Sequence, residues 1–453
     1  MAKVLPGKKA CTVNPLKMSA PIGAALAFLG MDRALPLLHG SQGCTAFGLV
    51  LFVRHFRETI PLQTTAMSEV TTILGGMDNV EQALLNIKKR ADPALIGICS
   101  TGITEAKGDD VAGFLTLIRE RHPELAGTEV VYVSTPDFVG GFADGWAKAV
   151  SAMVRDLVPA TPVRTPWQVN ILAGSHLSVG DIEEIRETVE AFGLTPIILP
   201  DLSGSLDGHI PENFLPHTLG GTRLEDVRRM GASAMTIAIG ESMRPAADLL
   251  WKQAGVPFEV LDRLTGLAAC DGFIRMLSDL SHNEVPSRYR RQRSQLQDAM
   301  LDGHFYFGGQ KVAIGAEPDL LYALSHFFAD LGAEVVCAVA PQDAPILERV
   351  AAETVQVGDL EDFEQGATGA GLLVTHSHGR QAAARLGIPF YRVGIPTFDR
   401  LGAAHRCTVG YRGTRNLIFE VGNLFIERLH AHENAVETAD VTGNAHAPSV
   451  AGH

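Results

Sequence analysis

Residues 35–47, Leu35-Pro-Leu-Leu-His39-Gly-Ser-Gln-Gly43-Cys44-Thr45-Ala-Phe47, join a short apolar run to a polar loop that contains one cysteine. The apolar run predicts a buried strand, and the apolar spacing from Thr45 onward predicts a helix. Cys44 is therefore expected at a strand-to-helix turn, where α/β proteins bind ligands. Gly40 and Gly43 would let the backbone approach a bulky group closely or take a positive φ. A helix N-terminus favours a thiolate, so Cys44 is a candidate nucleophile or metal ligand. The alternative is an inert cysteine buried beneath a turn.

Composition places the chain among α/β proteins and excludes several functions. The 453 residues are 46% hydrophobic, include 46 glycines and carry a net charge of −13. The length suggests about three domains, and the negative charge argues against binding nucleic acid or anionic membranes. The N-terminus resembles no signal peptide and no apolar run could span a membrane, so a soluble cytoplasmic protein is expected.

Apolar runs rich in Val, Ile and Leu recur along the chain and alternate with helical patterns. Such runs predict parallel strands covered on both faces. The expected fold class is α/β, with three Rossmann-like, doubly wound parallel-sheet domains. The expected division is residues 1–165, 166–285 and 286–430, followed by a disordered tail over 431–453. Residues 1–19 are expected to form an irregular lead-in.

Several possible sites carry weaker signals. The glycine loops after the strands at 169–173 and 311–315 complete no nucleotide-binding motif. His376 and His378 follow a strand, but their spacing suggests a capped turn rather than a metal site. His39 or His55 could serve as a base for Cys44, although no third group to orient the base is evident. The remaining cysteines form no C-x-x-C pair and are expected to be structural; they are Cys11, Cys99, Cys270, Cys337 and Cys407.

Cys44 alone cannot hold an iron–sulfur cluster, which usually needs four thiolates. If Cys44 is a cluster ligand, a second chain must supply the others. The sequence then predicts a hetero-oligomer with the cluster at the interface and an apolar surface around Cys44.

Five motifs identify a family resemblance. In combination they resemble the β-type chains of the nitrogenase component 1 family, from residue 13 to about residue 430. The motifs are Val13-Asn-Pro-Leu-Lys-Met-Ser19-Ala-Pro-Ile-Gly-Ala, His39-Gly-Ser-Gln-Gly-Cys44, Arg54-His-Phe-Arg-Glu-Thr-Ile-Pro-Leu-Gln-Thr-Thr65, Thr101-Gly-Ile-Thr-Glu-Ala-Lys-Gly-Asp-Asp110 and Gly394-Ile-Pro-Thr-Phe-Asp-Arg400.

The motifs differ from the catalytic β chain at the metal ligands. That chain gives three cysteines to an eight-iron P-cluster, whereas the corresponding positions here are Ser19, Cys44 and Gly102. Serine and glycine do not readily replace thiolate on iron–sulfur sites. The resemblance therefore favours the β-like chain of the scaffold that assembles the iron–molybdenum cofactor. Such a chain contributes one cysteine, here Cys44, to a [4Fe-4S] cluster, and a NifE partner contributes three.

The resemblance implies further partners but no catalytic residue in this chain. It implies an α2β2 heterotetramer with NifE, a cofactor precursor delivered by NifB, and interaction with the Fe protein NifH. The precursor is bound mainly by the partner chain, and no stand-alone enzymatic activity is expected. Ser19, Ser41, Gln42 and Gly102 are expected to line the cluster pocket, while His39 caps the loop.

Other functions remain open at this point. One is a catalytic β-type subunit of a nitrogenase or of a protochlorophyllide-reductase-like enzyme, which the missing cysteines disfavour. A vanadium-system paralogue is another, and a stand-alone nucleotide-dependent α/β enzyme is the most distant.

Overall fold

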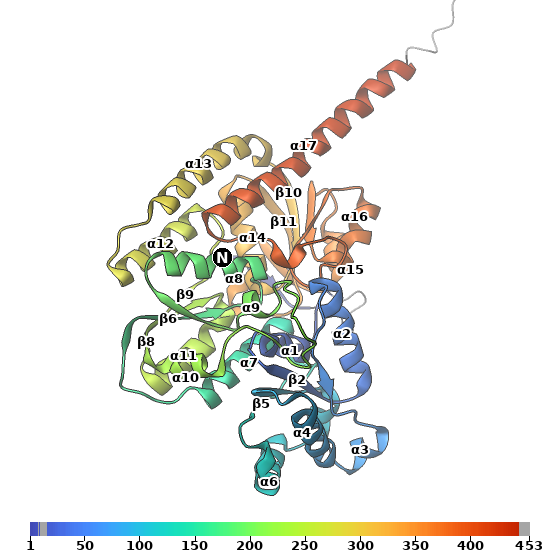
Figure 1. Ribbon diagram of the computed structural model, residues 1–453. Helices are drawn as coiled ribbons and strands as arrows, with labels where there is room; N and C mark the ends of the chain where they lie inside the picture. The colour runs from blue at the N-terminus through green and yellow to red at the C-terminus, as the bar shows by residue number, and fades with distance from the viewer. Residues whose placement is uncertain (8, 10–15, 444–453) are drawn as a thin grey trace, which may run out of the picture.

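Three all-parallel sheets flanked by helices form the molecule (Figure 1). The structure is a computed structural model that describes residues 1–7, 9 and 16–443, so Cys11 and residues 444–453 of the expected tail lie outside the described part. The expected α/β fold class with parallel-sheet domains is confirmed. No helix in the described ranges is both long enough and apolar enough to cross a membrane.

The first sheet has the strand order β3-β2-β4-β5. Its strands are buried on both faces, because α4 and α6 pack on one face and α1 and α7 on the other. This double coverage explains why the strands read as continuous apolar runs. The elements are α1 (Ala20–Leu29), β2 (Ala34–His39), α2 (Gln42–Phe56), β3 (Gln63–Thr64), α3 (Glu69–Leu74), α4 (Met77–Ala91), β4 (Leu95–Ser100), α5 (Gly102–Lys107), α6 (Val111–Arg121), β5 (Glu129–Val133) and α7 (Phe142–Leu157).

The second sheet has the order β7-β6-β8-β9. It is built from β6 (Thr165–Ala173), α8 (Val179–Ala191), β7 (Thr195–Leu199), α9 (Leu202–Ser205), α10 (Leu224–Arg229), β8 (Ser233–Ile239), α11 (Arg244–Ala254), β9 (Phe258–Leu261) and α12 (Leu267–Ser281).

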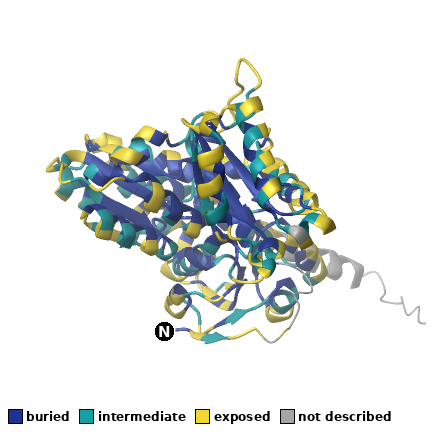
Figure 2. Cartoon of the chain, turned by 90° about the horizontal axis from the view of Figure 1, so that it is seen from below, coloured by how far each residue is buried: buried dark blue, intermediate teal, exposed yellow. Residues whose placement is uncertain are grey.

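The third sheet has six strands in the order β1-β12-β11-β10-β13-β14. Helices α13 and α17 pack against each other beside this sheet (Figure 1). The elements are β1 (Lys3–Leu5), α13 (Ser287–Phe307), β10 (Lys311–Gly315), α14 (Pro318–Asp330), β11 (Glu334–Ala340), β12 (Thr354–Val357), α15 (Leu360–Gly366), β13 (Leu372–Thr375), α16 (Arg380–Leu386), β14 (Phe390–Arg392) and α17 (Gly410–Gly443). Seen from below, the strands form the buried interior and the outer helix faces are exposed (Figure 2).

Two expectations from the sequence need correction. The lead-in is not wholly irregular, because Lys3–Leu5 forms an edge strand whose partner β12 lies about 350 residues away. Residues 431–443 of the expected disordered tail continue helix α17, which ends at Gly443. The motif at 101–110 contains the short helix α5.

Two glycines bring the starts of α1 and α7 together, side by side in Figure 1. A Cβ on Gly145 would lie 1.8 Å from the carbonyl oxygen of Ala20, and one on Gly23 would lie 1.9 Å from that of Phe142. Only glycine allows backbones to approach so closely. This close contact between α1 and α7 places Ser19, just before α1, beside the loop that leads into α7.

Candidate functional site

The loops that follow β2 and β4 are bonded together at the carboxyl edge of the first sheet. The hydroxyls of Thr101 and Thr104 donate to the carbonyl oxygen of His39, at 2.9 and 3.2 Å. A Cβ on Gly40 would lie 2.3 Å from Oγ1 of Thr101. Gly40 is thus required for close packing and not for a positive φ, which neither Gly40 nor Gly43 adopts. The loop that carries Cys44 is consequently fixed against the segment that carries Gly102.

Cys44 lies in the first turn of α2, which starts three residues before the expected position at Thr45. Its side chain is exposed, unlike those of the other described cysteines. The Ser41 hydroxyl lies 3.6 Å from Sγ of Cys44 and is its one polar contact in the described chain. An exposed, otherwise unengaged thiol at a sheet edge fits a metal ligand better than a buried structural cysteine.

The two positions that lack cysteine differ in their surroundings. Ser19 is half-buried at the N-cap of α1, but its side chain makes no capping hydrogen bond. Gly102 is the first residue of α5. A Cβ on Gly102 would lie 2.0 Å from Oδ1 of Asp137, so no side chain fits there while Asp137 keeps its position. Asp137 follows β5, the next strand of the sheet, and sequence reasoning missed it because its role depends on the pairing of β4 with β5.

Neither candidate base contacts Cys44. His39 is fully buried, with Nδ1 3.0 Å from Oγ1 of Thr65 and Nε2 3.4 Å from Oδ2 of Asp109. Burial lowers the pKa of His39, although the charge of Asp109 opposes the shift. Nδ1 of His55 instead accepts from the backbone N–H of Thr397 at 3.0 Å, and burial lowers its pKa to about 4. Both histidines therefore join segments of the fold, and the nucleophile hypothesis for Cys44 has no base.

The other predicted candidates are structural. Nδ1 of His376 accepts from the backbone N–H of His378, which makes this segment a capped turn, as expected. Burial raises the pKa of the thiols of Cys270 and Cys337 to about 12 and that of Cys99 further. Within residues 1–7, 9 and 16–443, no cluster of three or more His, Cys, Asp or Glu could hold a metal ion.

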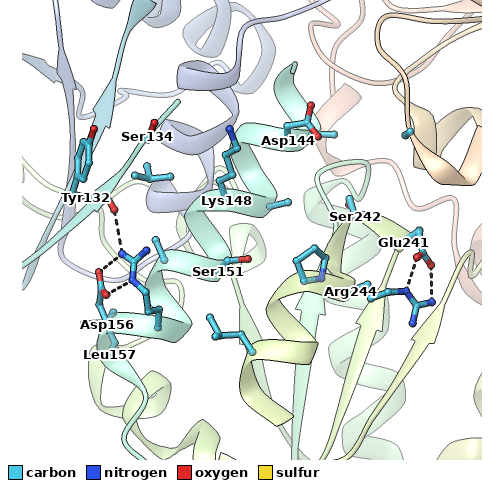
Figure 3. Close-up of a pocket in the computed structure, with 18 of the residues that line it drawn as sticks. Tyr132, Ser134, Asp144, Lys148, Ser151, Asp156, Leu157, Glu241, Ser242 and Arg244 are labelled. Atoms are coloured by element: carbon cyan, nitrogen blue, oxygen red, sulfur yellow. Dashed lines mark hydrogen bonds and ion pairs between the residues drawn. The ribbon is translucent and has the colours of Figure 1, made fainter. Parts of the chain in front are cut away.

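A cavity of about 1260 Å³ lies where elements of all three sheets meet. It is lined by β5 and α7, by the segment after β8, and by the start of α14. Figure 3 shows Lys148 and Ser151 on α7, with an Arg155–Asp156 pair at one end and an Arg244–Glu241 pair at the other. The lining contains no cysteine or histidine, so it offers none of the soft ligands that an iron–sulfur group prefers. No local sequence signal indicates this cavity, because it is assembled from segments more than 200 residues apart.

A family model described as Nitrogenase component 1 type Oxidoreductase matches residues 19–426. This chain therefore belongs to the nitrogenase component 1 type oxidoreductase family, which confirms the resemblance inferred from the motifs.

Its relatives include proteins named nitrogenase iron-molybdenum cofactor biosynthesis protein NifN. The one from Bradyrhizobium diazoefficiens is 58% identical over 445 residues, which cover 97% of this chain and 94% of the relative. The one from Nostoc sp. is 50% identical over 444 residues, covering 98% and 100%. The solved structure of nitrogenase Cp1 at pH 6.5 has a TM-score of 0.88 and 32% identity, and the match covers 93% of this chain and 95% of that one.

Proposed function

We propose that this chain is the β-like half of a scaffold for iron–molybdenum cofactor assembly, and that Cys44 is its one ligand to a [4Fe-4S] cluster shared with a NifE-type partner. Relatives at 50–58% identity are named for this biosynthesis. The observation that carries the proposal is the exposed thiol of Cys44 at the carboxyl edge of the sheet, where the described residues form no group of three or more His, Cys, Asp or Glu that could complete a metal site. A four-thiolate cluster here needs its remaining ligands from another chain.

Exposed apolar side chains on the segments that follow β2, β4 and β5 support a partner at this edge. We define the apolar rim as Phe47, Val50, Ile103 and Phe138, which lie on α2, on α5 and in the loop after β5. Phe47 is 72% exposed and Phe138 is 63% exposed, and both follow strands of the same sheet. Exposed apolar patches commonly mark interaction surfaces. The same elements thus offer both a ligand and a surface for the chain that would complete the cluster.

Each residue at the edge would have a separate role in holding such a cluster. Cys44 would bind iron, and Ser41 lies within reach of its sulfur, where a hydroxyl can tune a metal site. Ser19, Gln42 and Gly102 would line the pocket, and His39 would hold the loop in place. When bound, the cluster would supply one-electron transfer.

The wider assembly follows from the same proposal. The chain would form an α2β2 heterotetramer with NifE, receive precursor from NifB and interact with NifH. The large cavity lacks soft metal ligands, which supports a precursor held by the partner rather than by this chain. A catalytic β-type subunit is disfavoured because Ser19 and Gly102 provide no thiolate for an eight-iron cluster.

The test is to purify this chain anoxically, alone and with a NifE-type partner, and to measure iron and the EPR spectrum. We expect about four irons per heterodimer and a reduced [4Fe-4S]⁺ signal only in the complex. Cys44→Ala should abolish the signal, whereas Cys337→Ala, at a buried thiol, should leave it intact. Iron that is unchanged by Cys44→Ala would refute the ligand assignment, and an eight-iron signal would favour the catalytic alternative.

A further inference from the structure

The Asp137 carboxylate lies beside Gly102, the position that corresponds to the third cysteine of the catalytic β chain. Asp137 follows β5, whereas Cys44 follows β2 and Gly102 follows β4, and these three strands are neighbours in the order β2-β4-β5. Parallel strands bring their carboxyl ends to one edge of a sheet. The three residues therefore belong to the same edge, although the first and the last lie 93 positions apart in the sequence.

The Asp137 carboxylate fills the space that a side chain at position 102 would need. A Cβ on Gly102 would lie 2.0 Å from Oδ1, 2.8 Å from Cγ and 3.1 Å from Oδ2 of Asp137. All three distances are shorter than an ordinary van der Waals contact. A side chain at position 102 and the Asp137 carboxylate in this position thus exclude each other. A thiolate at 102 requires either that the exposed Asp137 side chain moves or that a smaller residue stands at 137.

The carboxylate is exposed in the isolated chain and makes no hydrogen bond or ion pair with the described residues. Phe138 and Val139, which follow it, are exposed apolar residues at 63% and 55%. A partner that covers these side chains would also remove water from Asp137. Since a desolvated charge acts strongly on its surroundings, the carboxylate would then act on whatever group occupies this edge.

We propose that Asp137 is a positioning and tuning residue for the shared cluster: its carboxylate occupies the space beside Gly102 that a further thiolate side chain would need, and its charge stabilises the oxidised cluster. This inference rests on the proposed function. A fixed negative charge beside an iron–sulfur cluster disfavours the addition of an electron, because net charge near the cluster sets its potential.

The first experiment tests the mutual exclusion without reference to iron. Gly102→Ala, Asp137→Gly and the double variant are made in the complex, and thermal unfolding midpoints are measured. We expect Gly102→Ala to lower the midpoint in the native background but to be tolerated when residue 137 is glycine. Equal effects in both backgrounds would overturn the steric part of the inference.

The second experiment measures the midpoint potential of the complex by EPR-monitored titration with dithionite. Asp137→Asn, which keeps the shape and removes the charge, should increase the reduced-to-oxidised ratio about tenfold at fixed potential, a positive shift of ~59 mV for one electron. Glu120→Gln, an exposed charge near the end of α6, is the matched control and should leave the potential unchanged. Iron content should stay the same in both.

The outcomes separate this inference from the function on which it rests. A normal cluster with an unmoved potential in Asp137→Asn would overturn the tuning role alone. A wild-type complex that contains no iron would overturn the tuning role and the proposed function together. The steric part would still be decided by the unfolding midpoints of the Gly102→Ala variants.

Discussion

Asp181 joins the second sheet to the closing part of the chain, and its removal should open that junction. Its carboxylate accepts hydrogen bonds from the backbone N–H groups of Ser178 at 2.9 Å, Thr408 at 2.5 Å and Val409 at 3.2 Å. The residue is 2% exposed. Asp181 therefore both completes the capping box at the start of α8 and anchors the segment just before α17.

The expected magnitude follows from the two bonds that cross between segments. A hydrogen bond to a charged group contributes ~1.5–3 kcal/mol, so losing those of Thr408 and Val409 should cost at least about 3 kcal/mol locally. Because 1.4 kcal/mol is a factor of ten, Asp181→Ala should speed amide exchange over residues 407–410 by roughly 10²-fold. Hydrogen–deuterium exchange of the complex, followed by peptide mass analysis, measures this directly.

Asp226→Ala is the control, because Asp226 pairs with Arg229 on an exposed helix face at 3.2 Å. Surface pairs of this kind contribute ~0–1 kcal/mol, so exchange should change little. If Asp181→Ala left exchange over 407–410 as slow as this control does, the carboxylate would not hold the junction and the argument from its hydrogen bonds would be refuted.

Three further predictions concern burial, packing and the partner surface. Burial raises the pKa of Glu317 to about 8, so the native state keeps a proton that the unfolded chain releases. The free energy of unfolding measured in urea should therefore fall by up to ~1.4 kcal/mol per pH unit from about pH 5 to 8 and then level off. Glu317→Gln should remove this pH dependence. Gly145→Ala should lower the free energy of unfolding in urea by ~1–3 kcal/mol, because the backbone of α1 lies close to that of α7 there. Gly272→Ala, which has open space around it, should not lower this free energy. Equal effects of the two substitutions would contradict the argument from close backbone packing. Phe47→Asp should weaken binding of the NifE-type partner at least 30-fold in calorimetry, since buried aromatic anchors contribute ~2 kcal/mol or more, while Leu117→Asp on α6 should not.

Local pattern was enough to predict the elements that carry Cys44. The apolar run before His39 is buried on both sides, so strand β2 is recognisable without its neighbours. The position of Cys44 at the turn follows from the polar, glycine-flanked loop, whereas its exposure does not, because the sequence left a buried cysteine open. The cap at Asp110, which accepts from the N–H of Gly113, was also predictable, because capping depends on residues three apart.

Strands that depend on distant partners were not predictable. β1, β3 and β12 have two to four residues each, and their segments contain Lys, Gln or Thr rather than a long apolar run. Each becomes a strand because a neighbouring strand supplies its hydrogen bonds; the carbonyl oxygen of Leu38, for example, accepts from the N–H of Thr65 at the end of β3. The short helix α5 was missed for a similar reason, since its capping threonines are held by the carbonyl oxygen of His39.

The sequence by itself determined the α/β class, the parallel sheets and the single cysteine of the ligand loop, because these depend on hydrophobic runs and residue identity within short windows. Only the tertiary structure decided that His39 and His55 turn away from Cys44, that Gly23 and Gly145 bring α1 against α7, and that Asp137 fills the space beside Gly102. These features depend on which strands pair and how closely backbones approach, and such contacts between distant segments leave no local pattern.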